Sequence, residues 1–357
     1  MFTTCAIDCA HSILSFAQLI IKMRRKRREE NRALTTIRKV LITGSNGFIG
    51  FHLASFLSGL GIETHCIDNF SNSENDEFYA ALLSRENVFG YDLDLELGDL
   101  AGIPDDFDLV FHLAAKNGTA NFYESPFDVL KSATIPTIRL IEKFKNFSGI
   151  FIMASTSENY AGAISKFNYV IPTPEDVPLV IEDIKNPRWS YAAGKIASES
   201  AVISAHIQFN MQFIITRIHN VYGPRMGFKH FIPDYILRVL NGKNEVYGQE
   251  QTRSFLFVDD ACRILFDLAR SSGAINEIIN VGSKEERTVE EVAILISSFA
   301  NIDSPLINSP APVGSVSRRV PDISKLEGLL GKLEPTPIRD GLEKTWVFYS
   351  NFYSNLK

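Results

Sequence analysis

Short, continuous apolar runs alternate with amphipathic stretches along the chain from residue 38 onward. Runs of Val, Leu and Ile without polar interruption are typical of strands that are buried on both faces of a parallel sheet. Stretches with apolar residues three or four positions apart are typical of helices packed on such a sheet. The pattern therefore predicts an α/β protein with a doubly wound parallel sheet. We expect its strands at 39–44, 62–69, 108–115, 149–155 and 213–220, and its helices at 48–61, 126–145 and 188–209.

Two features modify this pattern. Pro136 falls inside the helix predicted at 126–145 and is expected to kink it. Beyond Asn220 the chain has short helical runs, turn signals and a Pro/Ser-rich stretch at 303–315. We therefore predict an N-terminal extension (1–37), a main sheet domain (38–219) and a smaller C-terminal lobe (220–357) whose boundary is interleaved with the sheet domain.

The N-terminal extension, residues 1–37, contains an apolar run followed by a basic cluster. Residues 13–21 form an apolar run of nine, which is too short for a bilayer span of about 20 residues. A basic cluster at 22–28 follows this run, which is the reverse of the order in a secretory signal. We predict no stable membrane insertion. A membrane-surface helix and a disordered or weakly helical tail, translated from a start upstream of Met23, both remain open.

Composition narrows the class of protein. The chain has 357 residues, of which 45% are hydrophobic and 22% charged, values that are typical of a soluble globular protein. The net charge of −6 is spread along the sequence, so no nucleic-acid partner is predicted. The four cysteines form no CxxC pair, which favours a reducing compartment, here the cytoplasm. The seven histidines show no HExxH spacing, so no metal site is predicted.

A glycine-rich segment, GSNGFIG at 44–50, follows the first predicted strand and begins the first predicted helix. In that context, glycines allow a tight turn and a close approach of the backbone to a pyrophosphate, as in a Rossmann dinucleotide site. Asp68 ends the second strand, where a carboxylate can accept hydrogen bonds from ribose hydroxyls. No Arg or Lys occurs at 69–72 to hold a 2′-phosphate, which favours NAD over NADP.

The predicted cofactor-binding residues come from several strand ends. Asp99 is a candidate for an adenine contact, although a surface-turn aspartate fits the pattern nearly as well. The full set is Gly44, Asn46, Gly47, Phe48, Ile49, Gly50, Asp68, Asn69, Asp99, Leu100, Ala114 and Lys195.

A catalytic pair is predicted from YAAGK, which places Tyr191 and Lys195 one turn apart on one helix face. A phenol with an ordinary pKa of about 10 is a poor base at neutral pH. A lysine ammonium and an oxidised nicotinamide ring nearby would favour its phenolate form. Tyr191 could then accept a proton from a sugar hydroxyl while hydride leaves the same carbon. The sequence STSE, which includes Thr156 and Glu158, adds hydroxyls and a carboxylate at the end of another strand.

These motifs together resemble the extended short-chain dehydrogenase/reductase family, specifically its NAD-dependent nucleotide-sugar epimerases, dehydratases and decarboxylases. The resemblance covers roughly residues 38–348. It implies that Tyr191 is the base, that Lys195 holds the nicotinamide ribose and that Thr156 hydrogen-bonds the substrate's 4-oxygen. Oxidation at C4 gives a 4-keto sugar, which acidifies the C5 proton or makes a C5 carboxylate easy to lose.

The resemblance also gives Glu158 a role. In family members with Thr-Ser-Glu at this position, the residues matching Ser157 and Glu158 handle protons at C5 and C6. Simple 4-epimerases generally carry small or aliphatic residues there. The motif therefore favours a dehydratase or a decarboxylase, while a Glu158 that merely hydrogen-bonds a nearby amide is the structural alternative.

Further segments are similar to those of UDP-glucuronate decarboxylases. They are NPRWSYAAGK with Arg188, QTRSFLFVDD with Arg253 and RRVPDI with Arg319. By this resemblance Arg253 pairs with the substrate pyrophosphate, and Arg319 reaches the reacting end of the sugar, where it could hold a carboxylate. Asn220 matches a pyrophosphate or sugar contact, and Arg188 belongs to the Pro-Arg segment before the catalytic tyrosine.

Four positions or segments depart from the relatives' pattern. Ala133 stands where relatives usually have an Asn that helps to order a water at the lysine, and Pro136 stands where they have a glycine. Relatives have EVYG where this chain has ENYAG at 158–162, and residues 225–233 also differ from the decarboxylases. A different substrate, a slower enzyme and an uncharacterised subfamily are the alternatives that these departures leave open.

The sequence-based prediction is a NAD-dependent enzyme that acts on a nucleotide sugar through transient C4 oxidation. The favoured reaction is decarboxylation of UDP-glucuronate to UDP-xylose or its 4-keto precursor. A nucleotide-sugar 4-epimerase or 4,6-dehydratase is the main alternative, and a non-catalytic NAD-binding protein is a more remote one. The resemblance further implies a homodimer formed through the helices predicted at 126–145 and 188–209.

Overall fold

A computed structural model describes residues 37–71, 76–300, 306–310 and 317–356 of the chain. The predictions made for residues 13–21 and 22–28 lie outside the described residues. Within the described ranges, no helix combines the length and the apolar character that a membrane crossing requires.

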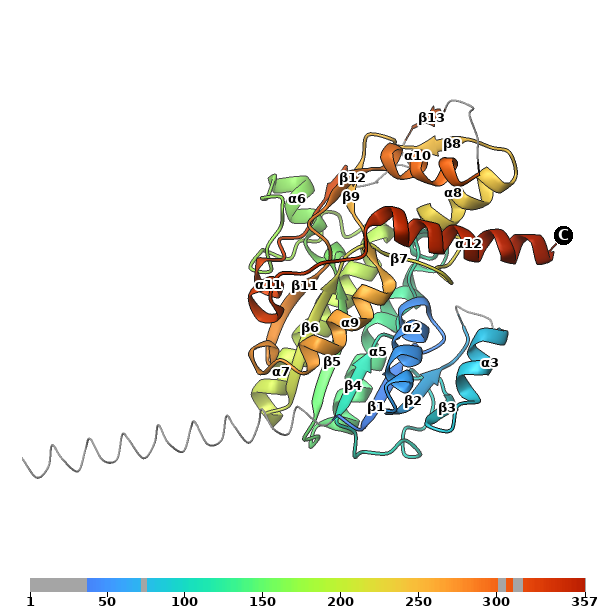
Figure 1. The fold of residues 1–357 in the computed structure, drawn as a ribbon. Coiled ribbons are helices and arrows are strands. Elements are labelled where there is room, and N and C mark those ends of the chain that lie inside the picture. The colour runs from blue at the N-terminus through green and yellow to red at the C-terminus, as the bar shows by residue number, and fades with distance from the viewer. Residues whose placement is uncertain (1–36, 72–75, 301–305, 311–316, 357) are drawn as a thin grey trace, which may run out of the picture.

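A seven-stranded parallel sheet forms the centre of the molecule, in the order β11-β6-β5-β4-β1-β2-β3 (Figure 1). Helices cover both faces of this sheet, so the predicted doubly wound fold is confirmed. Each of the five predicted strands is present. The strands are β1 (Lys39–Thr43), β2 (Glu63–Asp68), β3 (Val88–Asp92), β4 (Leu109–His112), β5 (Ile150–Thr156), β6 (Gln212–Ile218) and β11 (Glu277–Val281).

Alternating side chains of the central strand β1 divide the core into two layers. Val40 and Ile42 pack with α2 (Phe48–Gly59) and α9 (Val258–Ala269). Leu41 lies on the opposite face and packs with α5 (Pro126–Phe144) and α7 (Ser190–Phe209). All three side chains are fully buried, which explains why this strand reads as a continuous apolar run. The three predicted helices correspond to α2, α5 and α7.

Two strands of the sheet were not predicted. The edge strand β3 has a buried Val88, but its next three side chains are exposed or half-buried, so its sequence lacks an apolar run. Strand β11 comes from the C-terminal part of the chain and pairs in parallel with β6. The chain therefore returns to the sheet after residue 220, and the division at 219/220 stays a prediction.

The remaining elements surround the carboxyl ends of the strands or extend the C-terminal part. They are α3 (Glu77–Leu83), α4 (Thr119–Glu124), η1 (Ser157–Tyr160), α6 (Ala161–Phe167), η2 (Pro187–Trp189), β7 (Val221–Tyr222), α8 (Phe231–Leu240), β8 (Glu245–Tyr247), β9 (Thr252–Ser254), β10 (Leu256–Phe257), η3 (Ser272–Ala274), β12 (Glu286–Thr288), α10 (Val289–Phe299), β13 (Ile307–Ser309), β14 (Arg318–Arg319), α11 (Ser324–Leu330) and α12 (Ile338–Leu356).

Helix α5 continues past Pro136 to Phe144, and Pro136 itself is buried. Helices α5 and α7 approach each other closely beside it, because a Cβ atom built on Gly194 would lie only 2.7 Å from the Cβ of Ala133. The two small residues therefore set the spacing of this helix pair. The kink predicted at Pro136 stays a prediction.

A buried ion pair joins β6 to α7, and a hydrogen bond from the end of β5 meets the same carboxylate. Arg217 donates from Nε and Nη2 to Glu199 at 3.0 and 2.8 Å, and both side chains are almost fully buried. Ser155 Oγ and Asn159 Nδ2 donate to the same carboxylate at 2.5 and 2.8 Å. The carboxylate thus accepts hydrogen bonds from three side chains in the interior, where unpaired charge is costly.

We expect Glu199→Gln to lower the free energy of unfolding by about 3 kcal/mol, because Arg217 would stay buried without its counter-charge. Urea denaturation of the purified protein measures this loss. Asp267→Asn is the control, because Asp267 lies 3.9 Å from Arg270 in an exposed ion pair and should cost less than about 1 kcal/mol. A loss for Glu199→Gln as small as that of the control would contradict the expectation.

Candidate active site

A cleft of about 1020 Å³ opens at the carboxyl ends of the parallel strands. This is at the upper end of the roughly 300–1,000 Å³ of small-molecule sites, as expected where a cofactor and a substrate lie together. Most of the predicted site residues line it, namely Gly44, Asn46, Gly47, Phe48, Ile49, Gly50, Asp68, Asn69, Ala114, Thr156, Ser157, Glu158, Tyr191, Lys195, Asn220 and Arg319. The predicted residues that do not line it are Asp99, Leu100, Arg188 and Arg253.

The glycine-rich turn between β1 and α2 is shaped by two close backbone approaches. Gly44 has a φ of +69°, and a Cβ atom there would lie 2.8 Å from the Cα of Ala114. A Cβ atom on Gly50 would lie 2.0 Å from the carbonyl oxygen of Gly44. Gly47 precedes α2 and has no side chain to cap its first N–H groups. The turn therefore presents free N–H donors at a positive helix end, which fits a dinucleotide pyrophosphate.

Asp68 is held at the end of β2 by backbone donors. Its Oδ1 accepts from the N–H of Phe70 at 2.9 Å, and its Oδ2 accepts from the N–H of Asn46 at 2.9 Å. Each carboxylate oxygen retains a lone pair that a ribose hydroxyl could use. The residues fit NAD at this position of the cleft.

The other side of the cofactor region differs from the prediction. Asp99 is exposed and accepts from the N–H of Ala101 at 2.9 Å in a local turn. Residues 94–97, which follow β3, line the cleft instead. Sequence reasoning missed this segment because it missed β3, whose carboxyl end carries it.

Tyr191 and Lys195 are buried on the face of α7 that closes the cleft. The Tyr191 ring stacks on Phe122 of α4 with a centroid distance of 5.5 Å and an interplanar angle of 18°. Lys195 Nζ donates to the carbonyl oxygen of Ala154 at 2.8 Å and lies 5.9 Å from the centroid of the Tyr191 ring. One turn of α7 thus brings the phenol and the ammonium to the end of β5, as the spacing predicts.

Burial shifts the pKa values of both Tyr191 and Lys195. It raises the pKa of the Tyr191 phenol above its ordinary value, and the charge of Glu158 raises it further. Burial also lowers the pKa of Lys195 to about 8. The site without ligands therefore holds the phenol protonated, and a phenolate requires additional positive charge of the kind that an oxidised nicotinamide ring supplies.

Thr156, Ser157 and Glu158 mark the point where β5 passes into η1. Thr156 Oγ1 accepts from the N–H of Glu158 at 3.2 Å and so caps this turn. The turn brings the Thr156 hydroxyl and the Glu158 carboxylate to the same cleft as Tyr191.

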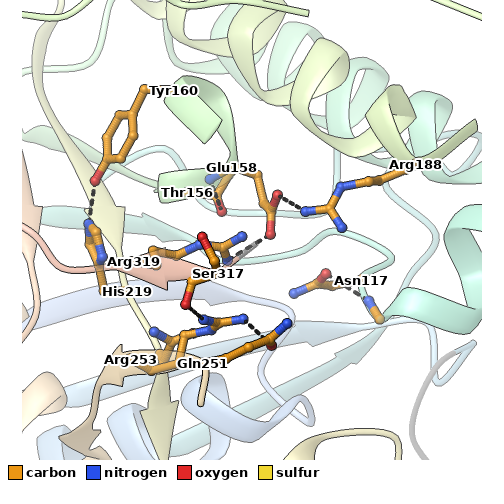
Figure 2. Close-up of polar contacts among 12 residues, drawn as sticks. Asn117, Thr156, Glu158, Tyr160, Arg188, His219, Gln251, Arg253, Ser317 and Arg319 are labelled. Atoms are coloured by element: carbon orange, nitrogen blue, oxygen red, sulfur yellow. Dashed lines mark hydrogen bonds and ion pairs between the residues drawn. The ribbon is translucent and has the colours of Figure 1, made fainter. Parts of the chain in front are cut away.

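Glu158 forms ion pairs with two arginines, as Figure 2 shows. Its carboxylate oxygens lie 2.7 Å from Arg319 Nη1 and 3.2 Å from Arg188 Nη2. Burial by itself would raise the pKa of Glu158, but Arg319 and then Arg188 outweigh it and hold the pKa below its ordinary value. Glu158 is therefore a carboxylate at neutral pH, and its partners are guanidinium groups rather than a single amide.

Arg253 lies behind this cluster and is held mainly by oxygen acceptors of its own neighbourhood. It donates to the carbonyl oxygens of Thr252 and Ser317 at 2.7 and 3.3 Å and to Gln251 Oε1 at 3.1 Å (Figure 2). Burial, and then repulsion from Arg319, lowers the pKa of Arg253 to about 10. The structure thus pairs Glu158 with Arg188 and Arg319, which are 131 positions apart in the sequence, and brings Arg253 near enough to act on the same carboxylate.

Besides residues 94–97, further residues of the cleft were missed from the sequence, among them Asn117, Phe122 and His219. Asn117 and Phe122 lie on the segment after β4, and His219 precedes Asn220 after β6. The His219 ring faces the Tyr160 hydroxyl in a buried hydrogen bond (Figure 2). Their position after strand ends is the signal that could have identified them, because ligands bind at that edge of a parallel sheet.

Ala133, the departure from the relatives' Asn, lies in the contact between α5 and α7. Its carbonyl oxygen accepts from Ser198 Oγ at 2.6 Å, and its methyl group packs against Gly194. Within the described part of the chain, no group of three or more His, Cys, Asp or Glu side chains is placed to hold a metal ion.

Comparison with known proteins identifies the family. The model of the NAD dependent epimerase/dehydratase family matches residues 40–282 of this chain. The chain therefore belongs to the NAD-dependent epimerase/dehydratase family, and NAD is its cofactor. The family resemblance and the cofactor predicted from the sequence are both confirmed.

Individual relatives cover most of the chain. UDP-glucuronic acid decarboxylase 1 of Danio rerio is 31% identical over 88% of this chain and 73% of its own length. UDP-N-acetyl-alpha-D-glucosaminuronate decarboxylase of Bacillus cytotoxicus is 29% identical over 86% of this chain and 96% of its own length. The structure is similar to that of UDP-glucuronic acid 4-epimerase from Bacillus cereus in complex with UDP-glucuronic acid and NAD, with a TM-score of 0.78 and 25% identity over 88% of this chain and 100% of that one.

We expect Tyr191→Phe to reduce turnover by about two to four orders of magnitude, because the variant lacks the group that accepts the hydroxyl proton. NAD affinity should stay nearly unchanged, since the ring and its stacking on Phe122 remain. Steady-state kinetics and NAD titration of the same preparation measure the two quantities. A variant with close to full activity would refute the acid–base assignment of Tyr191.

Proposed function

We propose that this protein decarboxylates UDP-glucuronate, with NAD, to UDP-xylose or its 4-keto precursor. The observation that carries the proposal is the cluster of Arg188, Arg253 and Arg319 around Glu158. Two guanidinium groups pair with this carboxylate and the third is near enough to act on it electrostatically, so the region around Glu158 carries an excess of positive charge. A substrate with a pyrophosphate and a sugar carboxylate matches that excess, whereas a neutral hexose brings only the pyrophosphate.

The first chemical step is assigned to Tyr191, Lys195 and Thr156. The Tyr191 phenolate accepts the proton of the sugar 4-hydroxyl, which Thr156 orients, and the Lys195 ammonium stabilises the phenolate. When bound, NAD supplies the hydride acceptor for the hydrogen on C4. The residues named for it in the glycine-rich turn and at Asp68 hold the dinucleotide at the strand ends.

The second step breaks the bond between C5 and the carboxylate. The 4-ketone accepts the electron pair of that bond as an enolate, carbon dioxide leaves, and C5 then takes up a proton. In this proposal Arg319 holds the carboxylate before it leaves, and Glu158 positions Arg319 through their 2.7 Å ion pair. The reduced cofactor would supply the hydride that completes the cycle to the pentose, and release before that return would give the 4-keto product and leave the cofactor reduced.

The relatives support this class of reaction and also define the alternative. The Danio rerio relative is named as a UDP-glucuronic acid decarboxylase, and the Bacillus cereus structure is of an epimerase bound to UDP-glucuronic acid. A dTDP-D-glucose 4,6-dehydratase of Dictyostelium discoideum also matches, at 31% identity over 72% of this chain. The excess of positive charge fits both enzymes of the acidic sugar, so 4-epimerisation of UDP-glucuronate is the second candidate.

We expect carbon dioxide release when the purified protein is incubated with UDP-glucuronate and NAD, and a nucleotide pentose in the mass spectrum of the products. UDP-glucose under the same conditions is the matched control, because it carries a hydroxymethyl group in place of the carboxylate, and UDP-galactose, its C4 epimer, is a second neutral control. UDP-galacturonate without carbon dioxide would support the epimerase instead. Turnover of the two neutral sugars without turnover of UDP-glucuronate would refute an acidic-sugar enzyme of either kind.

We also propose that two copies of the chain pair through α5 and α7, as the family resemblance implies. The support is the outer face of this helix pair, where Phe127 is 71% exposed, Ile138 43% and Ile207 78%. Apolar side chains gathered on one exposed face are typical of a protein interface. A cytoplasmic location is a further proposal, supported by Cys66 and Cys262, which are buried free thiols.

We expect Ile207→Asp to convert a dimer to a monomer, because a charge would then be buried at the helix contact. Size-exclusion chromatography with light scattering measures the mass in solution. Ile184→Asp is the matched control, since Ile184 is 82% exposed on the loop before η2, outside α5 and α7, and should leave the mass unchanged. A wild-type protein of monomeric mass would refute the pairing.

A further inference from the structure

Arg225 reaches from the C-terminal part of the chain to the glycine-rich turn. It follows β7, and its Nε and Nη2 donate to Asp76 Oδ2 at 2.9 and 2.6 Å. Nη2 also donates to Asn46 Oδ1 at 3.1 Å, and Cζ lies 4.0 Å from the centroid of the Phe51 ring. The side chain is only 8% exposed and lines the cleft. A guanidinium from a distant segment is therefore buried beside the first turn of α2.

The backbone around Arg225 is held in an unfavourable conformation. Arg225 has a φ of +63°, in the left-handed region that a non-glycine residue rarely adopts. His52 of α2 donates to the carbonyl oxygen of Pro224 at 2.9 Å, and the Tyr349 hydroxyl of α12 donates to that of Met226. The loop is thus fastened on both sides of the strained residue. The fold maintains this strain, and it directs the guanidinium toward the cofactor region.

One nitrogen of this guanidinium lacks an acceptor. Nη1 of Arg225 is buried and has no hydrogen-bond partner among the residues that the structure describes. A buried charged donor without an acceptor is costly, so such a group usually marks the position of a ligand. The uncapped N–H groups of α2 after Gly47 line the same cleft. Two independent sets of donors therefore belong to residues of one cleft, which fits an anion there.

The charges along this side of the cleft favour the same conclusion. Residues 69–84 contain no Lys or Arg, and Asp68 and Asp76 place two carboxylates there. Lys131 lines the cleft farther along but is paired with Glu96 at 3.1 Å. The segment after β2 thus supplies negative charge where a dinucleotide brings two phosphates, and Arg225 supplies a compensating cation from another part of the chain.

We propose that Arg225 binds a phosphate of the dinucleotide at the N-terminus of α2, and that Asp76 neutralises its guanidinium when no phosphate is present. The C-terminal part of the chain then takes part directly in cofactor binding. Asp76 occupies Nε and Nη2 and leaves Nη1 for the phosphate, so the two anions compete for the positive charge of Arg225 and not for the same N–H groups.

The experiment compares two probes, ADP-ribose and adenosine, by calorimetric titration of the full-length protein after removal of bound nucleotide. Arg225→Met should weaken ADP-ribose binding by about tenfold to a hundredfold, as for the loss of a charge-assisted hydrogen bond, and leave adenosine affinity unchanged. Arg270→Met is the matched control, because Arg270 also pairs with an aspartate and lies over a phenylalanine ring, but outside the cleft.

Asp76→Asn separates a phosphate ligand from a structural clamp. Asp76 Oδ1 caps α3 by accepting from the N–H of Tyr79 at 2.9 Å, and an asparagine preserves that acceptor. If Asp76 competes with the phosphate, this variant binds ADP-ribose more tightly than the wild type. If the Arg225–Asp76 pair only holds the fold together, both variants bind more weakly.

Three results would overturn the proposal. The first is an unchanged ADP-ribose affinity in Arg225→Met, and the second is an equal loss of adenosine affinity. The third is a variant in which only the KM for an acidic nucleotide sugar rises, which would assign Arg225 to the substrate. Thermal unfolding of each variant identifies a misfolded protein, and Arg225→Lys then serves as the second variant, with a charge but without the planar fork. Because the readout is binding of a dinucleotide fragment, failure here leaves the proposed reaction untouched.

Discussion

The active site depends on the buried ion pair between Glu199 and Arg217, because Glu199 joins the helix that carries Tyr191 and Lys195 to β6 and, through Ser155, to the end of β5. Helix α7 presents Tyr191, Lys195 and Glu199 at successive turns of one face. The first two face the cleft, and the third accepts from Arg217 on β6 and from Ser155 at the end of β5. Because Tyr191 and Glu199 lie on the same helix, a shift of α7 along the sheet that moved the phenol would also break this network. The ion pair thus fixes the distance between the tyrosine and the strand end that carries the threonine.

Low dielectric surroundings give the cleft its electrostatic character. Burial raises the pKa of Tyr191 and lowers that of Lys195, so both groups are driven toward their neutral forms. Glu158 behaves differently, because two guanidinium groups overcome the effect of burial and keep it ionised. The site at rest is therefore poor in phenolate and rich in guanidinium. A cationic nicotinamide ring would favour the phenolate form of Tyr191, and an anionic substrate would balance the charge of the guanidinium groups. Ligand binding and activation of the base are therefore one process.

The sequence predicts those features of the structure that depend on a single short segment, and it does not predict those that depend on contacts between distant segments. Strands buried on both faces are continuous apolar runs, so the five inner ones were predicted, whereas β3 exposes most of one face and was missed. Local motifs such as the glycine-rich turn and the Tyr191–Lys195 spacing were sufficient for the residues they contain. The pairing of Glu158 with Arg188, and the removal of Asp99 from the cleft, follow from tertiary packing and from the missed β3. The spacing of Glu158 and Arg188 along the sequence does not show that they pair, and the sequence around Asp99 does not show that it lies outside the cleft.

The departure at Ala133 is best understood from the packing of α5 on α7. A Cβ on Gly194 would come within 2.7 Å of the Ala133 methyl group, so a longer side chain at 133 would have to be accommodated in a contact that is already tight. The Ala133 carbonyl is occupied by Ser198, and Lys195 is fastened to the Ala154 carbonyl instead. The ammonium is thus positioned by β5 and not by the side chain at 133. The substitution therefore alters how the two helices fit, while the lysine keeps an anchor that directs it to the same strand end as Thr156.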